Sequence, residues 1–177
     1  NKTHFIFLFV SLLLFSCKKE NEHQPRKTTG KINTISVIID DQFWNGEIGD
    51  SIRNKFASPV IGLPQEEPLF NINQYPVRLL EGFMTDTRAI IVVKKAEENK
   101  FEIKKNQYAS PQNVFHISGK TAADIIACIE KNTPKMIETI KNCELAESQK
   151  INSQSLIDPK VIENKFHISV QIPSGYA

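Results

Sequence analysis

Apolar positions after residue 31 repeat with two different periods. Residues 32–39 are rich in β-branched side chains and alternate in polarity, which predicts a strand. From Asp41 to about residue 57 an apolar side chain recurs at every fourth position, which predicts an amphipathic helix. The stripe consists of Trp44, Ile48, Ile52 and Phe56. Gly46 and Gly49 each cost about 1 kcal/mol in a helix interior, so we expect close backbone packing or an irregular first turn.

The middle of the chain predicts further strands. Residues 69–75 form one candidate. Residues 88–94 contain a continuous apolar run, which is typical of a strand buried on both faces. A polar turn at 97–100 and an alternating, half-exposed segment follow, so residues 88–105 predict a β-hairpin. A further strand is predicted at 112–118.

The last third of the chain is mainly helical in pattern. Thr121 can cap a helix, with Asp124 at the reciprocal capping position. The apolar stripe keeps its phase past Pro134, so we expect one kinked helix or two nearly collinear ones. A third helix is predicted at 156–165, and the alternation at 166–172 predicts the last strand.

The order of these elements predicts an α+β fold. Local hairpins and separated strands both occur, so we expect a two-layer sandwich. In this sandwich the sheet is mixed and mostly antiparallel, and the helices pack on one face.

The amino-terminal segment predicts where in the cell the protein is located. A mainly apolar run from Phe5 to Phe15 follows Lys2, and it is too short for the ~20 residues of a membrane-spanning helix. A basic start and a short apolar core define a secretory signal. Ser16 followed by Cys17 marks the lipoprotein variant, in which the cysteine thiol is acylated. We therefore predict a signal peptide at residues 1–16 and a membrane-anchoring lipid on Cys17.

The predicted domains follow from this cleavage point. Residues 17–31 comprise the lipidated cysteine and a polar segment without apolar periodicity, which predicts a flexible tether. Residues 32–177 form the α+β domain. Pro173-Ser174-Gly175 is a sequence typical of a turn, and a turn is usually followed by another helix or strand. We therefore expect this domain to be truncated at its C-terminus.

The charge balance bears on nucleic-acid binding, and the spacing of the cysteines bears on disulfide formation. Lys and Arg total 22 against 20 Asp and Glu in the whole chain, and no basic patch stands out, so we expect no nucleic-acid partner. Cys128 and Cys143 would lie over ~20 Å apart on a straight helix, beyond disulfide reach. We favour two separate thiols, although a helix reversal near Pro134 would allow a bond.

One cluster of side chains could bind a ligand. Acidic residues surround Trp44, and the group comprises Asp40, Asp41, Glu47 and Asp50. They could form a carboxylate pair or a cation site, but helix capping and solvated acids explain the same pattern. We keep Trp44, Asp40, Asp41 and Asp50 as weak ligand-binding candidates.

No other motif in the sequence predicts a metal site or a catalytic residue. His116 and His167 lie in similar hexapeptides and could converge if their strands were neighbours, but no third ligand is nominated, so we expect no metal. The sequence contains no Gly-x-Ser-x-Gly nucleophile elbow, and no catalytic residue or cofactor is predicted. We favour a non-catalytic binding or assembly module with a possible envelope protein partner. The alternative is an envelope hydrolase whose catalytic groups lie partly in a missing C-terminal half.

Three segments together resemble a known family. They are Asp40-Asp41-x-x-Trp44-x-Gly46-x-x-Gly49-Asp50-x-Ile-Arg53, Gly62-Leu-Pro-Gln65-Glu-Glu67-Pro68-x-Phe70 and Tyr108-Ala-x-Pro111-Gln112. With the Cys17 signal, this pattern resembles a Bacteroidetes lipoprotein family catalogued only as a domain of unknown function. The resemblance implies a Gram-negative envelope and supplies no activity. We expect anchoring in the outer membrane facing the periplasm. The charged residues after Cys17 leave the cell surface as the alternative.

Overall fold

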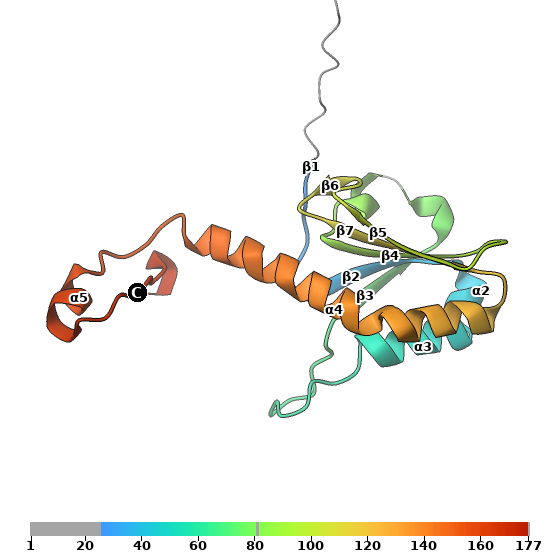
Figure 1. Ribbon diagram of the computed structural model, residues 1–177, viewed down its shortest axis with the longest axis horizontal. Coiled ribbons are helices and arrows are strands. Elements are labelled where there is room, and N and C mark those ends of the chain that lie inside the picture. The colour runs from blue at the N-terminus through green and yellow to red at the C-terminus, as the bar shows by residue number, and fades with distance from the viewer. Residues whose placement is uncertain (1–25, 81, 177) are drawn as a thin grey trace, which may run out of the picture.

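A five-stranded sheet forms the centre of the protein (Figure 1). The computed structural model describes residues 26–80 and 82–176. The strands lie in the order β3-β2-β4-β7-β5. Their bounds are Thr34–Ile38 for β2, Asn71–Tyr75 for β3, Ala89–Lys95 for β4, Lys100–Lys105 for β5 and Asn113–Gly119 for β7. Five of the predicted strands therefore form close to their expected positions, at β2, β3, β4, β5 and β7.

The sheet is mixed, as predicted, but it is mostly parallel rather than mostly antiparallel. β2 pairs in parallel with both β3 and β4, β4 pairs in parallel with β7, and β5 alone runs antiparallel. The first five residues of β4 are all buried, and burial on both faces is usual for a strand inside a parallel sheet. The predicted orientation was wrong because local pattern does not report strand direction.

The predicted 88–105 hairpin is also wrong, because β7 lies between β4 and β5. β5 pairs with β7, with Ile103 opposite Phe115. Phe115 is fully buried, whereas Ile103 is only half-buried. The more apolar strand thus takes the central position, and the half-exposed strand takes the edge.

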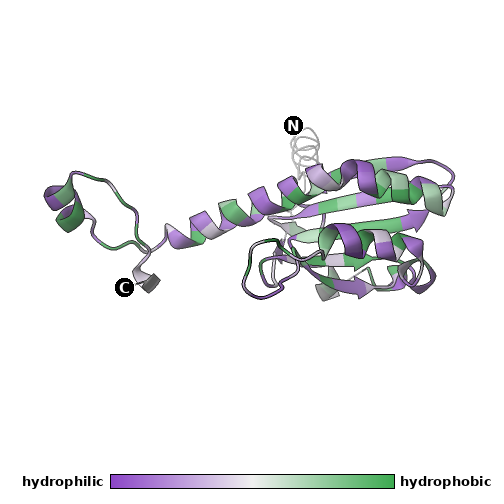
Figure 2. Ribbon diagram, turned by 90° about the horizontal axis from the view of Figure 1, so that it is seen from below, coloured by the Kyte–Doolittle hydropathy of each residue, from purple (hydrophilic) through white to green (hydrophobic). Residues whose placement is uncertain are grey.

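Two helices cover one face of the sheet. They are α3 (Glu47–Phe56) and α4 (Ala122–Asn152), and α3 follows the single turn α2 (Asp41–Trp44). Figure 2 shows both helices on the same side of the sheet. The core beneath them contains residues of β2, β4 and β7 together with Ile48, Ile52, Phe56, Ile125 and Ile129. The three members of the predicted stripe that lie in α3 are therefore buried, whereas Trp44 lies in α2 and is half-buried.

Gly49 explains the break between α2 and α3. A Cβ placed on this residue would lie 1.8 Å from the carbonyl oxygen of Trp44. The backbone of α2 therefore approaches α3 too closely for any side chain at this position. Both expectations, close packing and an irregular start, are confirmed.

The opposite face of the sheet is only partly covered. A smaller apolar cluster joins Ile38, Ile90, Val92 and Val114. The 3-10 helix η2 (Val77–Leu79) packs against this cluster through Val77. Leu80, Tyr75 and Tyr108 pack against the cluster as well. A second 3-10 helix, η3 (Gly82–Thr85), follows in the same connection. The helical cover is therefore not confined to one face.

The folded region begins earlier than Ile32. β1 (Arg26–Lys27) pairs in parallel with β6 (Ala109–Ser110). Thr28 is buried, and its backbone N–H donates to the carbonyl of Ser110 at 3.1 Å. The predicted tether therefore does not extend to residue 31, because its last residues pair with the domain.

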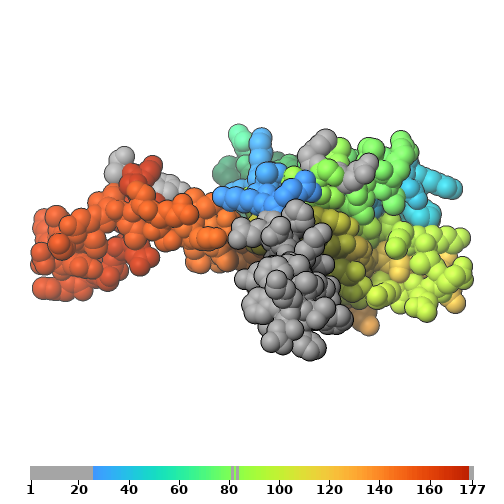
Figure 3. Space-filling view, turned by 90° about the horizontal axis from the view of Figure 1, so that it is seen from above, coloured from blue at the N-terminus to red at the C-terminus, as the bar shows by residue number. Residues whose placement is uncertain are grey.

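The C-terminal region projects from the domain as an arm (Figures 1 and 3). We define the arm as residues 153–176. α4 continues through Pro134 as one helix, as predicted, and α5 (Lys160–Phe166) follows in the arm. The strand predicted at 166–172 does not form. Within the described residues, no helix has the length and apolar character needed to cross a membrane.

Candidate functional site

The structure describes four of the five predicted site residues. Cys17 lies outside the described residues, so its lipidation stays a prediction. Asp50 forms an ion pair with Arg53 at 2.7 Å. The Arg53 guanidinium lies 4.5 Å above the Trp44 ring and donates to the Trp44 carbonyl at 3.0 Å. Trp44 itself is half-buried and packs against the main core.

The two aspartates before the helix have other partners. The Asp41 carboxylate accepts a hydrogen bond from the Gln74 amide at 3.0 Å. Asp40 is the N-cap residue of α2, where its carbonyl rather than its carboxylate accepts the helical N–H groups. The acidic residues are thus engaged separately. In the described ranges, no group of three or more His, Cys, Asp or Glu side chains could hold a metal ion.

The two histidines are also separate. His116 lies on β7, and its Nε2 is 2.7 Å from the Gln107 side-chain oxygen. His167 ends α5 in the left-handed conformation, with φ of 56°. Since residues 166–172 form no strand, the convergence that the two hexapeptides suggested does not occur.

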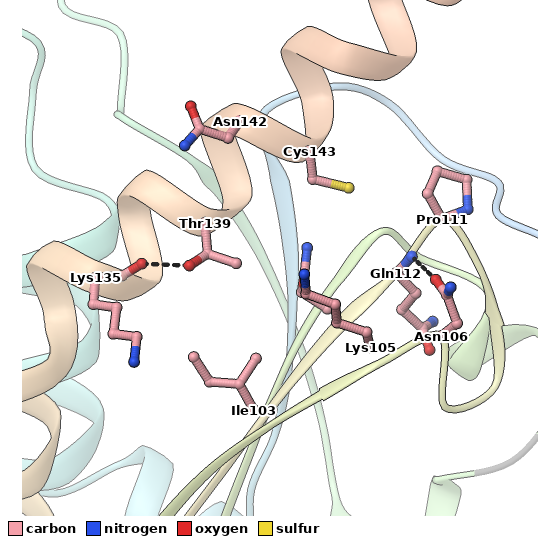
Figure 4. Close-up of a pocket in the computed structure, with 10 residues that line it drawn as sticks. Ile103, Lys105, Asn106, Pro111, Gln112, Lys135, Thr139, Asn142 and Cys143 are labelled. Carbon is pink, nitrogen blue, oxygen red and sulfur yellow. Dashed lines mark hydrogen bonds between the residues drawn. The ribbon is translucent and has the colours of Figure 1, made fainter.

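A polar groove lies between α4 and the edge of the sheet (Figure 4). Its volume is about 810 Å³. Thr139 and Cys143 project from α4 toward the strands, and Ile103 and Lys105 of β5 lie opposite (Figure 4). The remaining lining residues are Asn106, Pro111, Gln112, Asn113, Lys135 and Asn142. The spacing of the helical members, at four, seven and eight residues from Lys135, places them along one side of α4.

Gln112 fixes the loop that closes one end of the groove. Its buried side chain donates to the carbonyls of Thr85 and Thr87 at 2.6 and 2.8 Å. Its oxygen accepts the backbone N–H of Tyr108 at 3.0 Å. The Gln112 backbone N–H in turn donates to the Asn106 side-chain oxygen at 2.9 Å. These four bonds make this wall of the groove rigid.

Three polar groups in the groove are available for a ligand. Within residues 26–80 and 82–176, no hydrogen bond or ion pair engages the Lys105 ammonium, the Lys135 ammonium or the Asn142 amide. All three residues are exposed. The groove therefore presents two positive charges and an amide without competing partners.

Cys143 is not an activated nucleophile. Burial raises the pKa of its thiol, and the nearby Arg88 guanidinium only partly opposes this. The thiol form therefore dominates at neutral pH, and the thiolate is the reactive species. The residue lines the groove as a small, weakly polar surface.

Sequence reasoning missed this groove. Lys105 marked the end of an expected strand, and Cys143 belonged to the apolar stripe of a helix. The available signal was the Tyr108-Ala-x-Pro111-Gln112 segment, whose glutamine proves to be the buried brace of the wall. The helix and the loop meet only because β7 places β5 at the sheet edge.

The chain matches one family. Residues 28–153 match the family described as Domain of unknown function (DUF8532), and the chain therefore belongs to it. No curated protein and no solved structure matches the chain. The family region includes the five-stranded sheet, the helices α3 and α4, and the groove, whereas the arm lies outside it from residue 154 on.

Proposed function

We propose that this DUF8532 member is a lipid-anchored module of the bacterial cell envelope that binds carboxylate-bearing peptides in the polar groove. Anchoring is supported by the sequence Ser16-Cys17 after the short apolar run. The resemblance to Bacteroidetes lipoproteins supports an outer membrane location facing the periplasm. The cell surface is the alternative location.

The groove carries the binding proposal. Lys105 and Lys135 come from opposite walls, and neither has a carboxylate partner within the described chain. A ligand carboxylate between them would gain charge-assisted hydrogen bonds, which are about twice as strong as neutral ones. The two lysines therefore favour an anionic end group.

The other lining residues suit a peptide. The amide side chain of Asn142 can donate to a backbone carbonyl and accept from a backbone N–H. Ile103 and Pro111 offer apolar contact beside these polar groups. This mixture of a few polar groups and apolar surface is typical of ligand sites.

Protection of Cys143 from alkylation tests the binding proposal. The probes are short peptides with a free carboxyl terminus and the same peptides with an amidated terminus. The free acids should slow alkylation of Cys143 and leave Cys128 unaffected, because Cys128 lies on the same helix outside the groove. Both thiols are free and half-buried, so Cys128 is a matched control.

The amidated peptides and a charge variant sharpen this experiment. Amidation should weaken protection, and so should Lys105→Gln combined with Lys135→Gln. Equal protection by acids and amides, or by wild type and variant, would refute carboxylate recognition. Equal slowing at Cys128 would indicate a general effect on the fold.

Substitution of the predicted lipidation site tests the anchor. Cys17→Ala should release the protein from membranes or stall processing of the precursor, since acyl chains supply the membrane affinity. Unchanged membrane fractionation with normal maturation would refute anchoring. Protease treatment of intact cells tests the location: loss of the intact domain, with a periplasmic control protected, would favour the cell surface.

The arm favours assembly with a protein partner as a second candidate function. It exposes Val161, Phe166 and Ile168, whose exposed fractions are 77%, 58% and 54%. Exposed apolar patches commonly mark protein contacts. A photo-crosslinking residue at Val161 should capture a partner in intact cells, whereas the same residue at the exposed Lys95 should not. Equal capture at both positions would argue against this function.

A further inference from the structure

A charged hollow lies on the sheet face opposite α3 and α4. The 3-10 helix η2 and Tyr108 cover this face over Ile90, Val92 and Val114. Beyond this cover, toward the carboxyl ends of β4 and β7, the face carries polar side chains. In the view onto this side, the yellow-green β4–β5 segment lies at the surface (Figure 3).

Strand register brings the side chains of this hollow together. Lys94 and Lys100 both lie opposite Ser118, one on each side of β7. In the next row, His116 lies beside Glu102. A hollow of about 280 Å³ is lined by Lys94, Lys100, Glu102, Lys104, His116 and Ser118.

The lysines outnumber the acids in this hollow. Lys100 forms an ion pair with Glu102 at 2.9 Å. The hydrogen bond from Lys100 is the main cause that lowers the pKa of the Glu102 carboxyl, so this acid stays ionised. Within the described residues, Lys94 and Lys104 have no carboxylate within ion-pair distance.

The arrangement has an electrostatic cost. Like charges on neighbouring strands destabilise a sheet. The pKa of His116 is lowered, first by burial and then by the charge of Lys104. One glutamate offsets one of the three lysines, so the hollow keeps an excess of positive charge that a bound anion would neutralise.

We propose that this hollow is a binding site for a phosphate group. The small side chain of Ser118 leaves space between the Lys94 and Lys100 ammonium groups, and its hydroxyl already donates to the Glu98 carbonyl at 3.1 Å. Lys94 and Lys104 supply the uncompensated charge. A phosphate presents three acceptor oxygens and up to two charges, which matches several cations around one small hollow better than a carboxylate does.

The site is independent of the peptide-binding proposal, because it lies on the other face of the sheet. The phosphate could be free inorganic phosphate or the monoester headgroup of a lipid. Both sources present the same group to Lys94 and Lys104. The experiment therefore measures them separately.

Proton NMR of the histidine ring protons tests this site in the full chain purified in detergent micelles. Inorganic phosphate is titrated first, and micelles doped with phosphatidic acid or phosphatidylcholine are compared next. Bound phosphate should shift the His116 signal and raise its pKa, whereas the His167 signal should not respond. His116→Gln identifies the signal.

Paired lysine substitutions provide the control. Lys94→Gln with Lys104→Gln should weaken the response to phosphate at least about tenfold, since loss of about 1.4 kcal/mol corresponds to a factor of ten. Lys95→Gln with Lys131→Gln removes the same charge from the other side of the sheet, since Lys95 alternates with Lys94 along β4 and Lys131 lies on α4. This second pair should change the response less than about twofold.

Each outcome decides the proposal. A His116 response to inorganic phosphate that only the first pair weakens supports a site for the free anion. A response to phosphatidic acid alone, weakened by the same pair, supports a headgroup site. No response to either probe, or equal weakening by both pairs, overturns the proposal. Loss of peptide protection at Cys143 leaves it unaffected.

Discussion

The domain and the arm differ in how they use apolar side chains, and the end of α4, which precedes the arm, exposes them as the arm does. Between Ala122 and Glu144, α4 buries a residue at nearly every turn against the sheet. From Leu145 to Gly175 no side chain is buried, and seven large apolar side chains are exposed. They are Leu145, Ile151, Leu156, Ile157, Val161, Phe166 and Ile168.

This difference shows that an apolar stripe does not by itself make a core. The first half of α4 faces Phe115 and Ile117 of β7, and the same cluster contains Ile125 and Ile129. The last turns, from Leu145 on, extend past the sheet (Figure 2). Burial stabilises by roughly 25 cal/mol for each Å² of apolar surface, so the domain gains this stabilisation and the arm does not.

The largest contrast should come from two phenylalanines. Phe115→Ala removes a fully buried ring from the central region of the sheet and should lower the free energy of unfolding by about 3–5 kcal/mol. Phe166→Ala changes a ring that is 58% exposed in the arm and should cost less than about 1 kcal/mol. Chemical denaturation monitored by circular dichroism measures both. Equal losses would mean that the arm belongs to the cooperative core.

A smaller effect should come from the contact between α2 and α3. Gly49→Ala places a Cβ against the Trp44 carbonyl, so the backbone must shift, at a cost of about 2–3 kcal/mol. Gly46→Ala is the matched control, since its nearest neighbour would be 3.4 Å away. The control should change stability by less than about 1 kcal/mol. A tolerated Gly49→Ala would show that α2 can move away from α3 without loss of packing.

Substitution of Trp44 distinguishes a packing role of this residue from a ligand-binding role. Its ring is half-buried and lies under Arg53, so Trp44→Ala should cost about 2 kcal/mol, less than a fully buried tryptophan. Thermal unfolding measures the change. A loss below about 1 kcal/mol would mean that the ring contributes little to folding and would favour the ligand-binding interpretation of this residue.

The smallest effect should come from the point where α4 leaves the domain. Glu144 is buried, and its carboxylate accepts the Asn33 backbone N–H at 2.8 Å. Glu144→Ala leaves that donor without its partner and should cost about 1–2 kcal/mol. Glu138→Ala, at an exposed position of the same helix, should be nearly neutral. Loss of amide protection at Asn33 in hydrogen exchange should accompany the first change, and unaltered protection would contradict it.

Local pattern determined the elements whose signals lie within a few residues. The capping box of Thr121 and Asp124 forms as expected, with the Asp124 N–H donating to the Thr121 hydroxyl at 3.1 Å. The stripe of α3 and the buried run of β4 also form as expected, because helix and strand periods follow from backbone geometry. The break before α3 was predicted from Gly46 and Gly49, because glycine is unfavourable in a helix interior.

Only the tertiary structure decided how these elements meet. Strand direction, the insertion of β7 between β4 and β5, and the groove beside α4 all depend on contacts between distant residues. The alternating segment at 166–172 had the period of a strand, but no sheet edge pairs with it in the described structure. A period of two specifies which side chains share a face, whereas pairing requires a partner strand that local sequence does not supply.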